Sequence, residues 1–308
     1  MKLKIHFRSL HMKGFISKRK EWFGYLLFAL IFTVALLYYC FPSDAVRDYF
    51  QAMGLRANPR LALSVDRVEP SILVGLKFMK IKFALEDTPD RVILTADRLL
   101  IKPHLLSLLL GKLKFSFHCA AYQGDASGSV IFKKDPKMGF IDTEMALSNI
   151  NVGDYPYLSH LIGRPLEGTL GGTISYSGHN LMLDGSGKAN LRLSDGKVNF
   201  VQPFLTLESI DFSEMEIDAV FEKQKINVTR LELKGEQLQG TLSGTITIKA
   251  QIAQSSLDLK GTIEPFAALF KSNPEIQATV AVLKQRLDQG TLSFVIHGTV
   301  KEPIIKFT

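Results

Sequence analysis

Residues 166–176 read LEGTLGGTISY, and residues 238–248 read LQGTLSGTITI. In both segments the even positions carry apolar residues or glycine, and the odd positions carry polar or small residues. A period of two is typical of an antiparallel strand with one buried and one solvated face. The glycines fall on the apolar face, where a strand bends or another backbone approaches closely. The two segments therefore predict a repeated strand, and Leu170, Ile174, Leu242 and Ile246 are candidates for a core or groove face.

The same period extends outward from this repeat over most of residues 61–308. Further strands are predicted at 61–68, 75–85, 91–101, 112–121, 128–133, 187–193, 197–200, 214–222, 225–234, 291–297 and 303–307. Proline and glycine positions predict short helices at 103–110 and 155–161 and a longer one at 272–290. We expect a mainly β domain: a long curved antiparallel sheet, shaped as an open barrel or groove, with a few short capping helices.

These strands present more apolar surface than the predicted helices can cover. Such a sheet must close on itself, pack as a sandwich, or leave a curved apolar groove. The first two arrangements need only ordinary packing. The groove would indicate a lipid or the apolar surface of a partner as its occupant.

Residues 22–41, WFGYLLFALIFTVALLYYCF, contain no charge over 20 positions. This is about the length of helix that crosses a bilayer. Aromatic rings, which favour the membrane interface, flank the stretch at both ends: Trp22, Tyr25, Tyr38, Tyr39 and Phe41. The segment predicts a single transmembrane helix. A cleaved signal peptide is the alternative, with Ser43-x-Ala45 as its cleavage pattern, but its apolar region would span only about 7–15 residues.

The basic residues of the chain are concentrated before this segment. Residues 1–21 hold seven Lys or Arg and one Glu, with Lys18, Arg19 and Lys20 nearest the apolar run. The positive-inside rule predicts a cytoplasmic tail at 1–21 and a translocated domain at 61–308. Between them, 42–60 predicts a helical linker in which Ser43 or Asp44 caps a helix over 45–53 and Gly54 ends it.

The charge distribution argues against a nucleic-acid partner. The net charge is +7, and residues 1–21 contribute 7 − 1 = +6 of it, which leaves +1 for the remainder. Basic residues beside an apolar span indicate topology and anionic lipid rather than a nucleic-acid surface. None of the seven histidines has metal-ligand spacing, and the phosphate-loop-like residues 185–188 lack the required Ser or Thr. We expect the protein to be non-enzymatic and to bind no cofactor.

Five blocks of the sequence resemble, in order, the type II secretion system protein N (GspN-like) family. They are FPSDAVRDYF (41–50), ADRLLIKPHLLSLLLGKLKFSFHCAAYQGDASGSV (96–130), GRPLEGTLGGTISY (163–176), LELKGEQLQGTLSGTITI (231–248) and SNPEIQATVAVLKQRLDQGTLSFVIHGTVKEP (272–303). The likeness covers about residues 20–307 and depends on the order of the blocks, since each alone is a common β-motif. The strands also resemble the periplasmic AsmA-like proteins.

The first resemblance implies a single-pass protein of the bacterial inner membrane with a cytoplasmic N-terminus and a periplasmic domain. It implies a non-enzymatic component of the secretion machinery that docks other subunits, and it supplies no catalytic residues. The AsmA-like character implies the alternative, a lipid-handling or lipid-transfer protein with phospholipid in an apolar groove.

Overall fold

The computed structural model describes residues 13–308 apart from 58–60, 72–73, 86–87, 134–138, 156, 160–164, 180–183, 205–206, 250 and 266–290. Two helices come first, α1 (Lys13–Tyr39) and α2 (Ser43–Ala57). The described strands are β1 (Leu61–Ser71), β2 (Gly75–Leu85), β3 (Thr88–Pro103), β4 (Leu113–Ala121), β5 (Gly124–Lys133), β6 (Phe140–Asn151), β7 (Leu166–His179), β8 (Ser186–Phe204), β9 (Leu207–Glu222), β10 (Lys225–Lys234), β11 (Leu238–Thr247), β12 (Ser256–Pro265), β13 (Leu292–Thr299) and β14 (Pro303–Phe307). A short helix α3 (Leu105–Leu109) follows β3, and single 3-10 turns lie at Val152–Asp154 (η1) and Ile252–Gln254 (η2).

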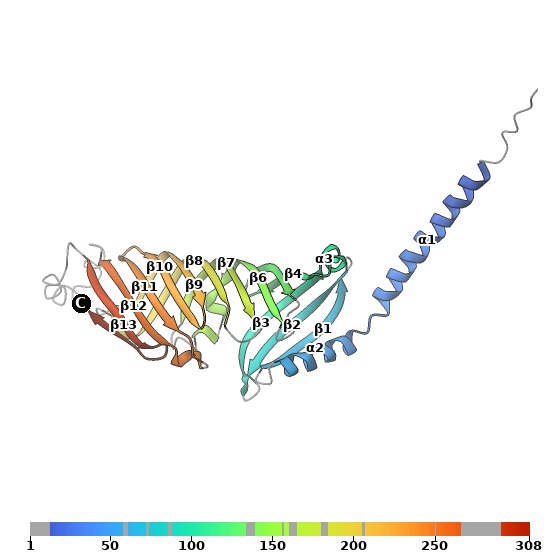
Figure 1. The fold of residues 1–308 in the computed structure, drawn as a ribbon. Coiled ribbons are helices and arrows are strands. Elements are labelled where there is room, and N and C mark those ends of the chain that lie inside the picture. The colour runs from blue at the N-terminus through green and yellow to red at the C-terminus, as the bar shows by residue number, and fades with distance from the viewer. Residues whose placement is uncertain are drawn as a thin grey trace, which may run out of the picture.

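All of these strands belong to one 14-stranded sheet in which each strand pairs with the next one along the chain. Every neighbouring pair is antiparallel, so the sheet is a single continuous meander with β1 and β14 at its two edges. The ribbon shows the strands side by side along one long axis, with α1 and α2 at the β1 end (Figure 1). The expectation of a mainly β protein built on an open antiparallel sheet is therefore confirmed.

Strand register shows that one face of the sheet is apolar across its whole length. Residues opposite each other in a ladder lie on the same face, so cross-strand partners can be followed from β1 to β14. One such row is Val68, Phe78, Leu99, Cys119, Ala126, Leu147, Gly172, Leu191, Ile217, Leu231, Leu242, Gly261, Phe294 and Phe307. A second is Pro70, Leu76, Ile101, Phe117, Gly128, Met145, Ile174, Ala189, Ala219, Val228, Gly244, Leu259, Ile296 and Ile305. Neither row contains a hydrophilic side chain.

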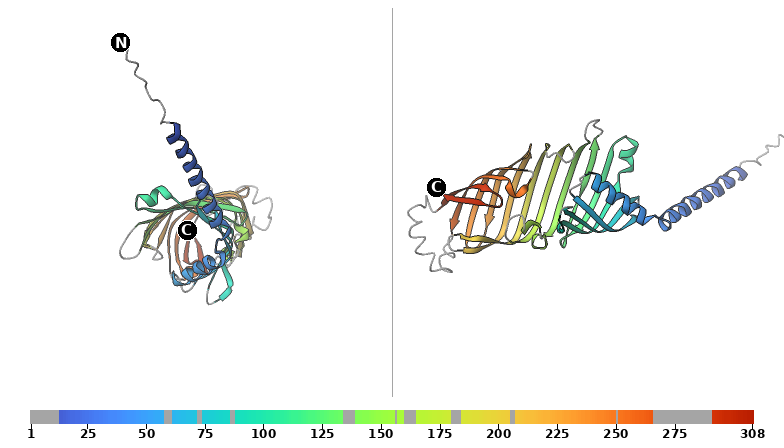
Figure 2. Two further views of the ribbon diagram at one scale, coloured as in Figure 1. Left: turned by 90° about the vertical axis from the view of Figure 1, so that its right-hand side faces the viewer. Right: turned by 90° about the horizontal axis from the view of Figure 1, so that it is seen from below.

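The apolar face is also the concave face. Val198 on β8 and Ile305 on β14 line the same cavity. In a flat sheet these strands would lie six steps, or about 29 Å, apart. The sheet must therefore curl toward its apolar side, and the end-on view shows this curl (Figure 2).

The two repeated segments share a backbone feature, a glycine with positive φ beside an irregular strand register. Gly172 on β7 and Gly244 on β11 have φ of 135° and 139°, in the region that side chains rarely adopt. In each case the preceding strand has an irregular register beside the glycine, between Leu147 and Ile150 on β6 and between Val228 and Leu231 on β10. Bulges and glycine kinks bend a sheet. The internal repeat is thus a repeated bend.

Helix α2 differs from the predicted linker. It runs past Gly54 to Ala57 and packs on β1 instead of ending at 53. A Cβ on Gly54 would lie 3.1 Å from Leu63 Cβ, so this glycine permits close approach of the helix to the sheet. The Ser43 hydroxyl donates to the backbone oxygen of Val68 (2.6 Å), so this residue ties the helix to β1.

Three other expectations can be checked. The short helix at 103–110 is confirmed as α3. The separate strands predicted at 187–193 and 197–200 are wrong, because β8 continues through Asp195, whose φ is 50°, and no turn divides it. Residues 157–159 of the predicted helix 155–161 are helical. The predicted helix 272–290 lies outside the described residues.

Helix α1 contains most of the segment predicted to cross a membrane. Its side chains are described at 22–36 and 38–39, and its large apolar residues are exposed. Within the part of the chain that the structure describes, no helix combines the length and apolarity needed to span a bilayer.

Candidate functional site: an apolar trough

The candidate site is the concave apolar face of the 14 strands, which we call the trough. The trough exists because residues of period two place their apolar members on one face and because the sheet bends toward that face. Its length follows from 13 strand-to-strand steps, which amount to about 60 Å. Along this length the trough differs in what covers it.

At the β1 end, the covered end, helix α2 closes the trough. Val65 and Val68 on β1 pack with Phe78 and Ile81 on β2 and with Ala96 on β3, and all are buried. The helix contributes Val46 and Phe50, together with Phe41 just before it, to this cluster. The Phe50 and Phe78 rings meet edge to face with centroids 5.0 Å apart. The covered end is an ordinary hydrophobic core.

At the other end, the open end, a cavity of about 260 Å³ lies between β8 and β14. Its lining is apolar except for one glycine and two threonines: Val198, Ile210, Leu231, Leu233, Leu238, Gly240, Thr241, Leu242, Thr262, Ile263, Phe294, Ile296 and Ile305. The floor is a cluster of buried side chains, Ile210, Leu238, Ile263 and Phe294. The described residues place no helix over this floor.

Glycines on the apolar face make room for aromatic rings. A Cβ on Gly261 would lie 2.7 Å from Cζ of Phe294, its partner on β13. A Cβ on Gly128 would lie 2.9 Å from Cζ of Phe117 on β4. Each ring therefore lies over the backbone of a glycine on the neighbouring strand and covers it.

The four candidate groove residues predicted from the repeat all lie on the trough and all are half-buried. Leu242 lines the open-end cavity. Ile174 also borders a hollow of about 480 Å³ among β5–β8, but most of that lining, such as Ser129, Glu144 and Lys188, belongs to the polar face. Leu170 packs against the buried cluster of Val152, Leu193 and Phe212. Ile246 pairs with Ile226 and Leu257 on its neighbouring strands.

Sequence reasoning missed part of the trough floor. Ile210 and Phe212 lie on β9, of which periodicity predicted only residues 214–222. The alternation of Leu207, Ile210 and Phe212 with polar residues was the available signal, but it is irregular at Ser209. Phe294 was within a predicted strand, yet nothing in the sequence shows that it meets Ile210 from four strands away.

The predicted membrane-anchor residues are not equivalent in the structure. Trp22, Tyr25, Tyr38 and Tyr39 are exposed on α1. Phe41 instead packs against the core of the covered end. The side chains of Lys18, Arg19 and Lys20 lie outside the described set.

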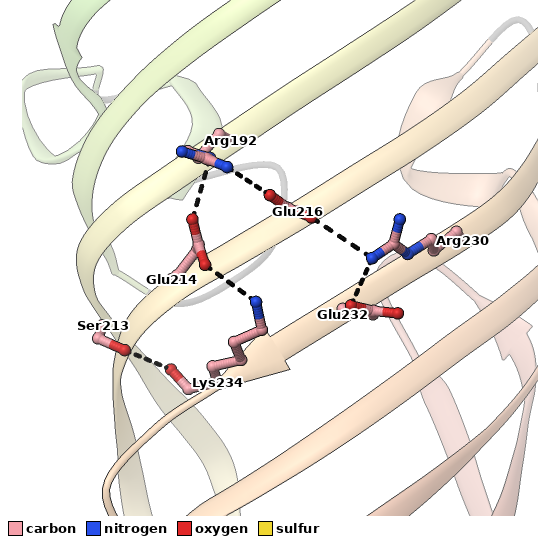
Figure 3. A network of polar contacts seen from close by, with 7 residues as sticks. All are labelled: Arg192, Ser213, Glu214, Glu216, Arg230, Glu232 and Lys234. Carbon is pink, nitrogen blue, oxygen red and sulfur yellow. Dashed lines mark hydrogen bonds and ion pairs between the residues drawn. The ribbon is translucent and has the colours of Figure 1, made fainter.

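The convex face is polar and carries a network of ion pairs across β8, β9 and β10 (Figure 3). Arg192 reaches Glu214 (3.0 Å) and Glu216 (2.5 Å), and Arg230 reaches Glu216 (3.6 Å) and Glu232 (2.6 Å). Lys234 closes the network on Glu214 at 3.2 Å.

Hydrogen bonds in this network shift the ionisation of its members. The bond from Arg230 lowers the pKa of Glu232. Hydrogen bonds to Glu216 and Glu232 raise the pKa of Arg192 and Arg230, respectively. With three cationic and three anionic residues, the network is neutral as a whole and its pairing depends on strand register.

Titratable side chains elsewhere are dispersed. His118 pairs with Asp125 (3.1 Å) and His297 with Asp258 (3.4 Å), each pair on the surface. Among the described residues no three His, Cys, Asp or Glu side chains gather as a metal site would require. Cys40 and Cys119 are free thiols, and burial together with the nearby Asp125 and Asp97 carboxylates raises the pKa of Cys119. The expectation of a non-enzymatic protein stays a prediction.

Comparison of the chain with protein-family models, with curated proteins and with solved structures gives no significant match in any of the three.

Proposed function

We propose that this chain is a non-enzymatic, inner-membrane-anchored periplasmic component of the type II protein secretion machinery whose trough docks another subunit. The observation that carries the docking role is the pair of cross-strand rows that stay apolar through all 14 described strands. The apolar face runs for about 60 Å, and beyond the covered end residues such as Leu191, Ile217 and Leu242 are only half-buried, which indicates an elongated apolar occupant.

The chain's own α2 supports a protein occupant. This 15-residue helix lies in the trough at the covered end and inserts apolar side chains between those of β1–β3. The open end presents the same kind of surface, in which the half-buried Leu242 and Ile296 pack against the buried Ile263 and Phe294. An amphipathic helix of a partner subunit would bind there in the way that α2 binds at the other end.

The placement in the membrane and in secretion is supported by the sequence. The uncharged residues 22–41 follow a tail of net charge +6, which favours an anchor with the domain on the periplasmic side. The five blocks that resemble GspN-like proteins supply the association with type II secretion. In this chain they fall on α2, on β3–β5, on β7, on β10–β11 and on the region that leads to β13 and β14.

A second candidate function is lipid handling of the AsmA-like kind. The observation that favours it is the open-end cavity, whose accessible lining is hydrocarbon, since the hydroxyls of Thr241 and Thr262 bond each other (2.8 Å) on the opposite face. A phospholipid acyl chain fits such a lining because it requires no hydrogen-bond partner.

Photo-crosslinking in the native cell distinguishes these functions. A benzoylphenylalanine would replace Leu242, which lines the cavity, and in a matched control would replace Ser243, which faces outward on the same strand. We expect the probe at 242 to capture a secretion subunit that the probe at 243 does not. Phospholipid captured at 242 without any such subunit would instead establish the second candidate. Equal products at both positions would rule out a function for the trough.

A further inference from the structure

Helix α3 and the residue after it form an exposed apolar protrusion, which we call the leucine tip. It consists of Leu105, Leu106, Leu108, Leu109 and Leu110, between β3 and β4. Their exposure runs from 36% at Leu108 to 84% at Leu109. The sequence led us to expect a helix that caps the sheet, but these leucines join none of the hydrophobic clusters formed by the described residues. Five exposed leucines within six residues are unusual on a soluble surface and indicate a binding surface.

The residues around the leucine tip are basic. Between positions 98 and 124 the chain has Arg98, Lys102, Lys112 and Lys114 and no Asp or Glu. Lys112 is exposed, and among the described residues no carboxylate pairs with Lys102, Lys112 or Lys114. Exposed apolar side chains flanked by lysines match an interface between hydrocarbon and anionic headgroups.

The leucine tip lies at the end of the sheet from which α1 departs. Ser43, four residues after the end of α1, bonds Val68 near the end of β1. The β1–β2 connection is at this same rim, with exposed Val74, and the pairing of Leu76 with Ile101 brings the end of β3 there too. Figure 1 shows α1 and α3 at the same end of the molecule.

We propose that the leucine tip is a second membrane contact, in which the leucines enter the surface of the bilayer and Lys102, Lys112 and Lys114 bind anionic phospholipid headgroups. The inference rests on the proposed function in one respect only: the bilayer that the leucine tip contacts is the one that holds α1. Two contacts, α1 and the leucine tip, would fix the covered end of the trough against the membrane and direct the open end away from it.

Depth-dependent quenching in nanodiscs of phosphatidylcholine and phosphatidylglycerol tests this proposal with the full chain. Trp22→Phe removes the only native tryptophan. Leu109→Trp then reports on the leucine tip, and Ile304→Trp, on a residue that is 55% exposed on β14, is the matched control. With lipids brominated along the acyl chain, we expect the Leu109→Trp emission to fall roughly twofold, as for a side chain about 5–10 Å deep in the interface. The Ile304→Trp emission should not change.

The charge of Lys112 gives a second readout. Lys112→Glu in the Leu109→Trp protein should weaken quenching in nanodiscs with phosphatidylglycerol and have less effect in pure phosphatidylcholine. Equal emission of Leu109→Trp with and without brominated lipid would overturn the proposal, even where the chain is incorporated through α1. If the chain is not incorporated at all, the proposed anchor fails, and the same quenching measured with added vesicles still decides the role of the leucine tip.

Discussion

The two ends of the trough have the same strand chemistry and different cover. At the covered end Val68 is 0% exposed beneath α2, and its neighbours on β2 and β3 are almost as deeply buried. At the open end Leu242 and Ile296 occupy the corresponding rows and remain half-exposed around a cavity of about 260 Å³. The comparison shows that curvature of the sheet buries only the floor of the open end, Ile210, Leu238, Ile263 and Phe294, whereas α2 covers the apolar face at the covered end.

This difference separates stability from binding along one sheet. Burial of a large apolar side chain contributes about 1.5–3 kcal/mol, and the covered end obtains this from residues of α2 as well as from the strands. The open end keeps part of its apolar surface available to an occupant. A continuous meander allows this division because neighbouring strands make local contacts and no strand must cross from one end to the other.

The largest effect that we predict is for a charge at the covered end. Val68→Asp would bury a carboxylate in a cluster of hydrophobic described residues and should cost roughly 4 kcal/mol in the free energy of unfolding. Leu242→Asp at the open end should cost only about 1 kcal/mol, because the carboxylate can reach water in the cavity and half of the burial is lost. Urea unfolding of the full chain in detergent, followed by far-UV circular dichroism, compares the two.

The matched pair has a clear contrary outcome. Equal losses for Val68→Asp and Leu242→Asp would mean that the open end is packed as tightly as the covered end. The docking role of the trough would then lose its structural basis.

A smaller effect is predicted where the sheet bends. Gly172→Ala places a side chain on a residue with φ of 135°, and its Cβ would clash with the backbone oxygen of Asn190. We expect a loss of about 1–3 kcal/mol in stability. Gly171→Ala is the control, because its Cβ would lie 3.5 Å from the nearest atom, the backbone oxygen of Leu147. A similar cost for both variants in thermal melts would show that the bend does not depend on Gly172.

The sequence was sufficient for the apolar and polar faces and insufficient for the bend. Period two in residues 166–176 and 238–248 predicts which side chains share a face, because alternation is fixed by the backbone of a single strand. The apolar pattern of residues 75–85 changes parity at Lys80, between Phe78 and Ile81; this feature is also local, and in the structure Lys80 has a φ of 49° and Phe78 and Ile81 lie on one face. Such features need no knowledge of distant residues.

Features that depend on a partner element were misread. Gly54 looks like the end of a helix, yet it permits α2 to approach Leu63. Leu105 and its neighbours look like a cap, yet they are exposed in the structure. Whether Leu242 lies in a core or a groove depends on what covers it from above. Periodicity carries no information on that question, which is why the sequence left both alternatives open.

The smallest predicted effect on stability concerns the ion pairs of the convex face, which α2 does not cover. The hydrogen bond from Arg230 lowers the pKa of Glu232 in the folded protein. A carboxyl group with a depressed folded pKa stabilises the fold above its unfolded value of about 4.3, and this contribution is lost as the pH falls through the folded value. Glu232→Gln should therefore make the melting temperature fall slightly less than in the unmodified chain between about pH 7 and about pH 3.

Glu236→Gln is the control for this last change, since Glu236 lies in the turn after β10 and has no ion-pair partner among the described residues. It should leave the pH dependence of the melting temperature as it is. The difference made by Glu232→Gln should also shrink at about 1 M salt, because exposed charges are screened over about 3 Å there. If Glu232→Gln had an effect as large as that of Val68→Asp, the convex network rather than the covered end would hold the sheet together, and the contrast between the two ends of the trough would no longer explain where the stability lies.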